Sequence, residues 1–327
     1  MSGYYLLLNG EYAYNKSYSV GYDFGSIKRL DRYTMGALST LYICFALKNH
    51  DSDFIKAYFD SLKWYREIYK ISAEGARNHG LLNVPTDAFF ETKHYLPQNL
   101  NEQRKIADFM IALEHRIDAQ QSLVDNLKKY KRGLLSNLFG EKITQGCTTK
   151  SYYFSEIAQR RSEKYDPTSG IEYPCVELEN IEQETGKILS TVPSTAQSSI
   201  KNIAKSGDTL FGKLRPYLRK YAFAQKTMAC SSEIWALIPS DAVLPKFLFY
   251  LVQTEQFLRV ANISSGTKMP RAEWSNIEKT EFFIPDPFVQ RKVVSLLEGL
   301  DQKITFADSA LFSLNRLKAS LMQQLFI

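Results

Sequence analysis

Two stretches of the chain carry the same heptad pattern of apolar positions. Apolar residues recur in both at alternating spacings of four and three residues, which is the a/d pattern of a coiled-coil helix. The resulting apolar stripe is narrow and needs a partner helix. The predicted seam consists of Ile106, Met110, Leu113, Ile117, Val124, Leu127, Leu134, Leu138, Val293, Leu297, Leu300, Ile304, Leu311, Leu314, Leu321 and Leu325. We therefore predict two long helices, each of about 60 Å, that pair as an antiparallel coiled coil.

The two stretches are copies of one another. Residues 103–139 align without a gap with residues 290–326, at a constant offset of 187. A repeat of this length indicates a protein that is built twice. Both copies place a lysine, Lys131 and Lys318, at one seam position. Polar seam residues fix the register of coiled coils, so these lysines favour mutual pairing over the alternative of two amphipathic helices in separate cores.

The segments before the long helices also repeat, more loosely. Residues 10–16 resemble 207–213, and residues 39–43 resemble 232–237. A helical stretch and a basic glycine loop follow in each, in an order typical of an α+β module. The predicted fold is therefore α+β, with two recognition-type modules and two long helices. Its expected parts are a first module over 1–96, a helix over 97–140, a second module over 141–285 and a helix over 286–327. Because 141–206 has no counterpart at the start of the chain, we expect the first module to be N-terminally incomplete.

Composition narrows the class of protein. The chain has 327 residues, of which 44% are hydrophobic and 23% charged, as in soluble globular proteins. No apolar run is long enough for a membrane span, and the N-terminus does not predict a secretory signal. The four cysteines lie far apart without a Cys-x-x-Cys motif, which favours reduced thiols and a cytoplasmic location.

Charge and candidate chemistry point away from intrinsic catalysis. The net charge of +6 is mild, so any contact with nucleic acid must be local. The four histidines have no metal-ligand spacing, and neither a nucleophile elbow nor a phosphate-binding loop occurs. We therefore expect no catalytic residue, no metal site and no cofactor in this chain. One alternative stays open, a metal-dependent nuclease that uses Glu177, Glu179 and Glu182 on a predicted strand.

Several motifs resemble the specificity (S) subunits of type I restriction-modification systems. The run Leu96-Pro97 followed by Glu102-Gln103-Arg104-Lys105-Ile106 opens the first helix, and it recurs before the second with Val289 in place of Glu102. The segments Gly10–Ser19, Ile27–Leu30 and Leu38–Tyr42 are similar to the family as well.

This resemblance implies a subunit that recognises a bipartite site on double-stranded DNA, one target recognition domain for each half, with the helices setting the distance between them. It also implies methylation (M) subunits that carry S-adenosylmethionine, and restriction (R) subunits that carry ATP and Mg²⁺. A coiled-coil scaffold that does not bind DNA is the other alternative.

Basic and aromatic residues of the loops are the candidate DNA contacts. Arginine, lysine, asparagine and histidine suit phosphates and base edges, and aromatic rings can stack. Surface solvation is the alternative for each of them. The candidates are Lys16, Lys28, Arg29, Arg77, Asn78, His79, Lys213, Arg215, Tyr217, Arg219, Lys268, Arg271 and Trp274.

Overall fold

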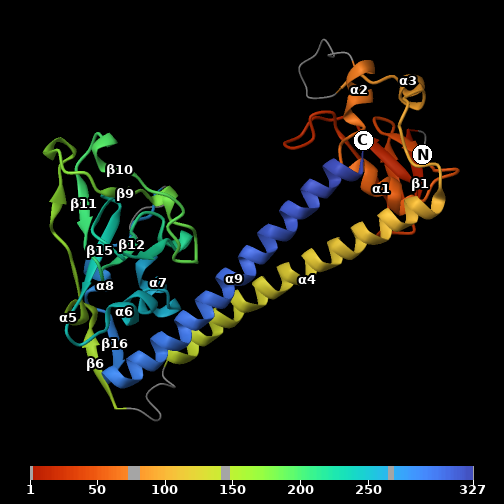
Figure 1. Ribbon diagram of the computed structural model, residues 1–327. Coiled ribbons are helices and arrows are strands. Elements are labelled where there is room, and N and C mark those ends of the chain that lie inside the picture. Colours follow the sequence, from red (N-terminus) through yellow and green to blue (C-terminus); the bar gives the residue numbers. More distant parts are fainter. Residues whose placement is uncertain (1–2, 73–81, 141–147, 264–268, 327) are drawn as a thin grey trace. The chain divides into compact units, whose positions relative to one another are not determined.

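A computed structural model describes residues 3–72, 82–140, 148–263 and 269–326 of the chain (Figure 1). The described chain separates into two compact units. Unit 1 comprises residues 1–123 and 306–327, and unit 2 comprises residues 124–305. The two long helices contribute to both units. Three of the predicted DNA contacts in the first glycine loop, Arg77, Asn78 and His79, and Lys268 in the second lie outside the described residues.

The long helices are α4, Leu100–Phe139, and α9, Pro287–Leu325. Asp286 caps α9, because its carboxylate accepts hydrogen bonds from the amides of Phe288 and Val289 at 2.8 and 3.1 Å. Pro287 occupies the first helical position, where its missing amide costs no helical hydrogen bond. The first helix begins at Leu100, three residues after Pro97, where the predicted helix segment starts. The side-chain oxygen of Asn99 accepts a hydrogen bond from the amide of Asn101 just before this start.

The two helices run antiparallel where they pair. In unit 1, Lys318 donates to Glu114 at 2.7 Å and Gln120 donates to the carbonyl of Ala307 at 3.0 Å. Residue numbers therefore decrease along α9 in the direction in which they increase along α4. In unit 2, Lys131 pairs with Asp301 at 2.7 Å. Every predicted seam position is buried or half-buried and none is exposed. The shared lysines therefore meet acids of the facing helix.

The described residues of unit 1 form two small antiparallel sheets and three short helices besides its parts of α4 and α9. One sheet pairs β1 with β4, and the other has the order β3-β2-β5. Tyr12, Tyr14, Phe54 and Trp64 fill its core and are at most 1% exposed. The elements are β1 Tyr4–Leu8, β2 Tyr12–Asn15, β3 Ser26–Arg29, β4 Met35–Ser39, β5 Ile43–Phe45, α1 Ser52–Asp60, α2 Tyr65–Ile71 and α3 Thr86–Phe90.

Unit 2 is larger, and its described residues form three sheets. Their orders are β10-β9-β14-β11-β8, β13-β12-β15-β7 and β16-β6. Its elements are β6 Thr149–Tyr153, α5 Phe154–Ile157, β7 Ala158–Arg160, β8 Lys164–Tyr165, β9 Pro174–Val176, β10 Val192–Pro193, β11 Lys201–Ala204, β12 Thr209–Gly212, β13 Tyr221–Phe223, β14 Met228–Cys230, β15 Ile234–Pro239, α6 Pro245–Leu251, α7 Glu255–Ala261, α8 Trp274–Ile277 and β16 Glu281–Pro285.

The two units repeat one strand topology. β1 pairs with β4 as β11 pairs with β14, and β2 pairs with β3 and β5 as β12 pairs with β13 and β15. Unit 2 extends both sheets further, with β8 paired to β11, β9 paired to β14 and β7 paired to β15. The described part of unit 1 has no strand in these three positions, so no described strand pairs with the outer edges of β1, β4 and β5.

A buried glutamine anchors each long helix to its module. Gln103 accepts a hydrogen bond from the amide of Asp51 at 2.8 Å and donates to the carbonyl of Pro97 at 2.6 Å. Its repeat partner Gln290 accepts from the amide of Leu244 at 2.8 Å and donates to the carbonyl of Pro285 at 2.9 Å. Both glutamines are at most 1% exposed. The repeat in sequence is therefore a repeat of one structural joint.

The far end of each long helix is fixed by a repeated aromatic contact. Phe326 of the α9 end packs on Phe54 of α1, with ring centroids 5.6 Å apart. Phe139 at the end of α4 packs on Phe247 of α6 at 4.8 Å. Each helix thus begins on one module and ends against the helical layer of the other, within the unit to which that end belongs.

Candidate nucleic-acid interface

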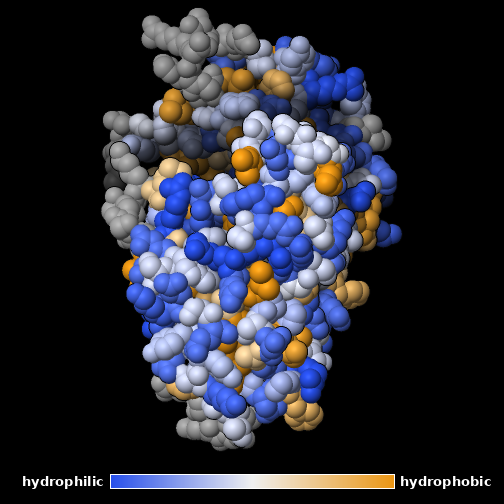
Figure 2. Space-filling model, turned by 90° about the vertical axis from the view of Figure 1, so that its left-hand side faces the viewer, coloured by the Kyte–Doolittle hydropathy of each residue, from blue (hydrophilic) through white to orange (hydrophobic). Residues whose placement is uncertain are grey.

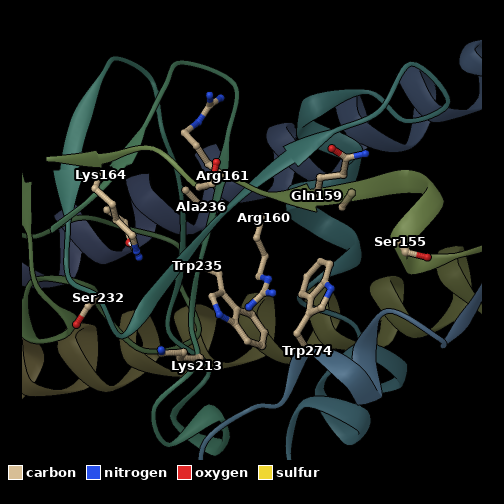
Figure 3. A pocket seen from close by; sticks show the side chains of 13 residues that line it. Ser155, Gln159, Arg160, Arg161, Lys164, Lys213, Ser232, Trp235, Ala236 and Trp274 are labelled. Atoms are coloured by element: carbon tan, nitrogen blue, oxygen red, sulfur yellow. Dashed lines mark hydrogen bonds between the residues drawn. The ribbon is translucent and has the colours of Figure 1, made fainter.

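A cavity of about 500 Å³ opens in unit 2 beside strand β7 (Figure 3). Strands β7 and β15, the end of β12 and the start of α8 bring its walls together. The lining residues are Ser155, Ala158, Gln159, Arg160, Arg161, Ser162, Lys164, Asn202, Lys213, Ser232, Trp235, Ala236 and Trp274. Four of them are cationic and none is acidic. An acid-free basic hollow attracts anions, and phosphate or base-edge acceptors suit it.

Two tryptophans hold the side chain of Arg160. Its guanidinium carbon lies 4.8 Å from the ring centroid of Trp274 and 5.9 Å from that of Trp235. The two indoles cross at 87° with centroids 5.7 Å apart. Figure 3 shows the guanidinium between the two rings, on the side of β7 opposite to Gln159 and Arg161. A cation over an indole face is stabilised by the negative face of the ring, so this side chain is held in place.

Buried aromatic residues fix the two tryptophans in turn. Phe211 stacks on Trp235 with centroids 6.2 Å apart, and Phe154 packs against Trp274 at 5.8 Å. Both phenylalanines are fully buried in the core of unit 2. The aromatic wall of the cavity therefore continues the hydrophobic core and has little freedom to move.

The other cations of the cavity are held in different ways. Arg161 makes a bidentate contact with Asp208 at 2.6 and 2.8 Å, and these hydrogen bonds raise the pKa of the Arg161 guanidinium. Lys164 donates to the side-chain oxygen of Asn202 at 2.6 Å. The backbone of Lys213 is fixed on both sides, by the carbonyl of Glu233 and the amide of Ala272, while no side-chain partner is found for Lys213 among the described residues.

Two of the predicted DNA contacts line this cavity, Lys213 and Trp274. Arg215 and Tyr217 are exposed but lie outside it. Arg219 is held by Glu255 at 2.6 Å and Arg271 by Glu233 at 3.1 Å. The guanidinium groups of these last two arginines are thus paired with carboxylates, which favours a structural role for both. Their contact with DNA stays a prediction.

Two of the described candidates in unit 1, Lys28 and Arg29, are held by ion pairs. Arg29 bridges Asp31 and Asp53 at 2.6 and 2.7 Å, and its side chain is only 14% exposed. Lys28 pairs with Asp60 at 2.5 Å. Lys16 is half-buried at the end of β2, at the repeat position of Lys213. Arg29 therefore ties β3 to the start of α1 and is an anchor of the module.

Sequence reasoning missed Arg160, Arg161 and Lys164. The signal was present, since three cations fall within five residues. The internal repeat directed attention to 205–226 instead, because the segment that carries β7 has no counterpart in the first module. The cavity forms only when β7 pairs with β15, which places Arg160 opposite Leu237, and such a long-range pairing is not visible in a local pattern.

The three glutamates of the nuclease alternative do not form a metal site. Glu177 precedes a short 3-10 helix, Leu178–Asn180, so Glu177 and Glu179 do not alternate along a strand as predicted. Lys201 donates to Glu177 at 2.7 Å. In the described ranges, no group of three or more His, Cys, Asp or Glu residues is arranged to hold a metal ion.

The outer surface is predominantly hydrophilic in the view of Figure 2, where apolar residues form small separate groups. Within the described part of the chain, no helix combines the length and apolar character needed to cross a membrane.

Comparison with known proteins gives one consistent family. Residues 154–311 match the family model described as Type I restriction modification DNA specificity domain. The chain is 26% identical over 198 residues to the HindI specificity subunit of Haemophilus influenzae, covering 54% of this chain and 40% of that subunit. It is 22% identical over 318 residues to the MjaVIII specificity subunit of Methanocaldococcus jannaschii, covering 89% of this chain and 73% of that subunit.

Solved structures share the fold. A chain from a study of the assembly of a type I R-M system superimposes with a TM-score of 0.62 at 15% identity, covering 99% of this chain and 83% of that one. The S subunit from M. genitalium gives a TM-score of 0.56 at 16% identity, covering 98% and 84%. The matched domain contains the whole of β7, β12, β15 and α8, and therefore the cavity.

Proposed function

We propose that the chain is a specificity subunit of a type I restriction-modification system, and that it recognises DNA chiefly through the basic cavity of unit 2. The observation that carries this proposal is the lining of the cavity, four cations and two tryptophans without an acid, inside the matched specificity domain. Cations that neutralise phosphates release counterions, so binding by such a site must weaken steeply with salt.

We assign phosphate contacts to the lysines. Lys213, whose side chain extends from a fixed backbone, suits a phosphate, because an ammonium is a point charge without a preferred plane. Lys164 lies in the same cavity and adds positive charge. Lys16 at the repeat position in unit 1 is the corresponding phosphate contact for the other half of a bipartite site. The described part of unit 1 has no counterpart of β7, so unit 2 supplies most of the recognition.

The chemistry is proposed to reside on partner subunits. In this proposal the chain is non-catalytic and cytoplasmic, and it brings M subunits with S-adenosylmethionine and R subunits with ATP and Mg²⁺ to a DNA site. The single family found by the comparisons supports this assignment, and the separated glutamates of unit 2 give the nuclease alternative no structural support.

A salt titration tests the proposal. Binding of the full chain, with M subunits, to duplex DNA is measured by fluorescence anisotropy at several salt concentrations. Lys213→Ala should weaken binding and reduce the slope of log K against log salt by about 1, the loss of one phosphate contact. Lys226→Ala, an exposed lysine of unit 2 outside the cavity, is the matched control and should leave the slope unchanged.

Two results would speak against it. Equal slopes for wild type and Lys213→Ala would remove the cavity from the interface. Absence of DNA binding by the soluble complex at low salt would favour the alternative of a coiled-coil scaffold.

A further inference from the structure

We propose that Arg160 reads a guanine in the half-site bound by unit 2, donating two parallel hydrogen bonds to its O6 and N7. This inference rests on the proposed function and assigns one base to one side chain. Arg160 leaves β7 toward the cavity, and its guanidinium lies between Trp235 and Trp274 (Figure 3).

The hydrogen-bond donors of Arg160 are available. Within the described ranges, no acid pairs with its guanidinium. Four other arginines of unit 2 are in ion pairs with glutamate or aspartate, and so do not compete for a base edge without losing that contact. They are Arg132 with Glu184, Arg161 with Asp208, Arg219 with Glu255 and Arg271 with Glu233.

The indole rings fix the side chain in the manner that base reading requires. An arginine that must be ordered on binding loses rotamer freedom, which lowers the affinity. Here the ordering exists before DNA arrives, because the rings approach the guanidinium at 4.8 and 5.9 Å and are themselves packed on Phe154 and Phe211. A planar fork held in one place selects a partner with matching geometry.

Guanine is the base whose major-groove edge matches this fork. A guanidinium carries donors only. Guanine presents two adjacent acceptors, whereas adenine pairs one acceptor with a donor, cytosine presents a donor and thymine a single acceptor. Phosphate also accepts two hydrogen bonds, but it repeats at every nucleotide and gives no sequence preference. The two readings therefore differ in a measurable way.

The test is a selection experiment on a randomised DNA duplex, with the full chain assembled with M subunits. Wild type, Arg160→Lys and Arg160→Ala are compared, and thermal unfolding of each variant confirms that it folds. Wild type should select a motif that contains guanine in one half. Arg160→Lys keeps the charge but loses the fork, so the preference at one guanine position should fall by about 5- to 150-fold. The rest of the motif should persist.

Arg259→Lys is the matched control, since Arg259 is an exposed arginine of the same unit outside the cavity. Its motif should equal that of wild type. If Arg160→Lys and Arg160→Ala keep the full motif, or lower affinity equally for all sequences, the guanine assignment is wrong while the proposed function stands. If wild type itself selects no motif, the proposed function has failed.

Discussion

Replacing Gln290 by leucine should detach α9 from the module of unit 2. The glutamine is 1% exposed and accepts a hydrogen bond from the amide of Leu244 at 2.8 Å. It also donates at 2.9 Å to the carbonyls of Ala242 and Pro285. Leucine fills much of the space but leaves the Leu244 amide without this partner, which costs about 1–3 kcal/mol. Two further hydrogen bonds are worth roughly 1 kcal/mol each.

We therefore expect Gln290→Leu to lower the free energy of unfolding by about 3–5 kcal/mol, a large part of the roughly 5–15 kcal/mol that stabilises a domain. Urea unfolding followed by circular dichroism gives the free energy, and hydrogen exchange gives the protection of the Leu244 amide. Gln256→Leu is the matched control, because its hydrogen bond to the carbonyl of Glu281 is exposed. An unchanged midpoint together with an unchanged exchange rate at Leu244 would refute the anchoring role of Gln290.

Three further results are expected. Leu113→Asp and Leu300→Asp each place a charge at a seam position at most 8% exposed, and should cost several kcal/mol in urea unfolding; equal midpoints would contradict helix pairing. Burial raises the pKa of the Cys230 thiol to about 12 from an ordinary 9.0. Between about pH 9 and 12 the thiol therefore ionises in the unfolded chain before it does in the folded one, so the free energy of unfolding measured in urea should fall across this range. The fall should be smaller for Cys230→Ala. Amides on the outer edges of β1 and β4 should exchange with deuterium faster than those of β11 and β14, and equal protection would show that these edges are covered.

The long helices were predictable because their pattern is local. A stripe with a 3.5-residue period needs no knowledge of the rest of the fold, and all its predicted positions proved buried or half-buried. The pattern did not reveal that the helix ends pack on the modules. Leu135 lies outside the predicted seam and yet is 5% exposed, in the core of unit 2.

The candidate site was predictable only in part. Lys213 and Trp274 were found because basic and aromatic residues gather in the loops that the repeat marks. Arg160 escaped notice because its importance depends on two tryptophans that are 75 or more positions further along the chain. Arg29 appeared to be free in sequence, whereas the fold places Asp31 and Asp53 on it. The sequence shows where basic residues are, and only the tertiary structure shows which of them are paired with acids.

In the proposed function, the cavity of unit 2 directs a modification complex to one DNA sequence. The most direct measurement is methylome sequencing of a methylation-free host that expresses the chain with its methylation subunit, as wild type and as Arg160→Ala with Lys213→Ala. The wild-type strain should carry methylated adenine within one defined motif, and the strain with the double variant should lose that motif. The same motif in both strains, or none in the wild-type strain despite a soluble complex, would refute this role of the cavity.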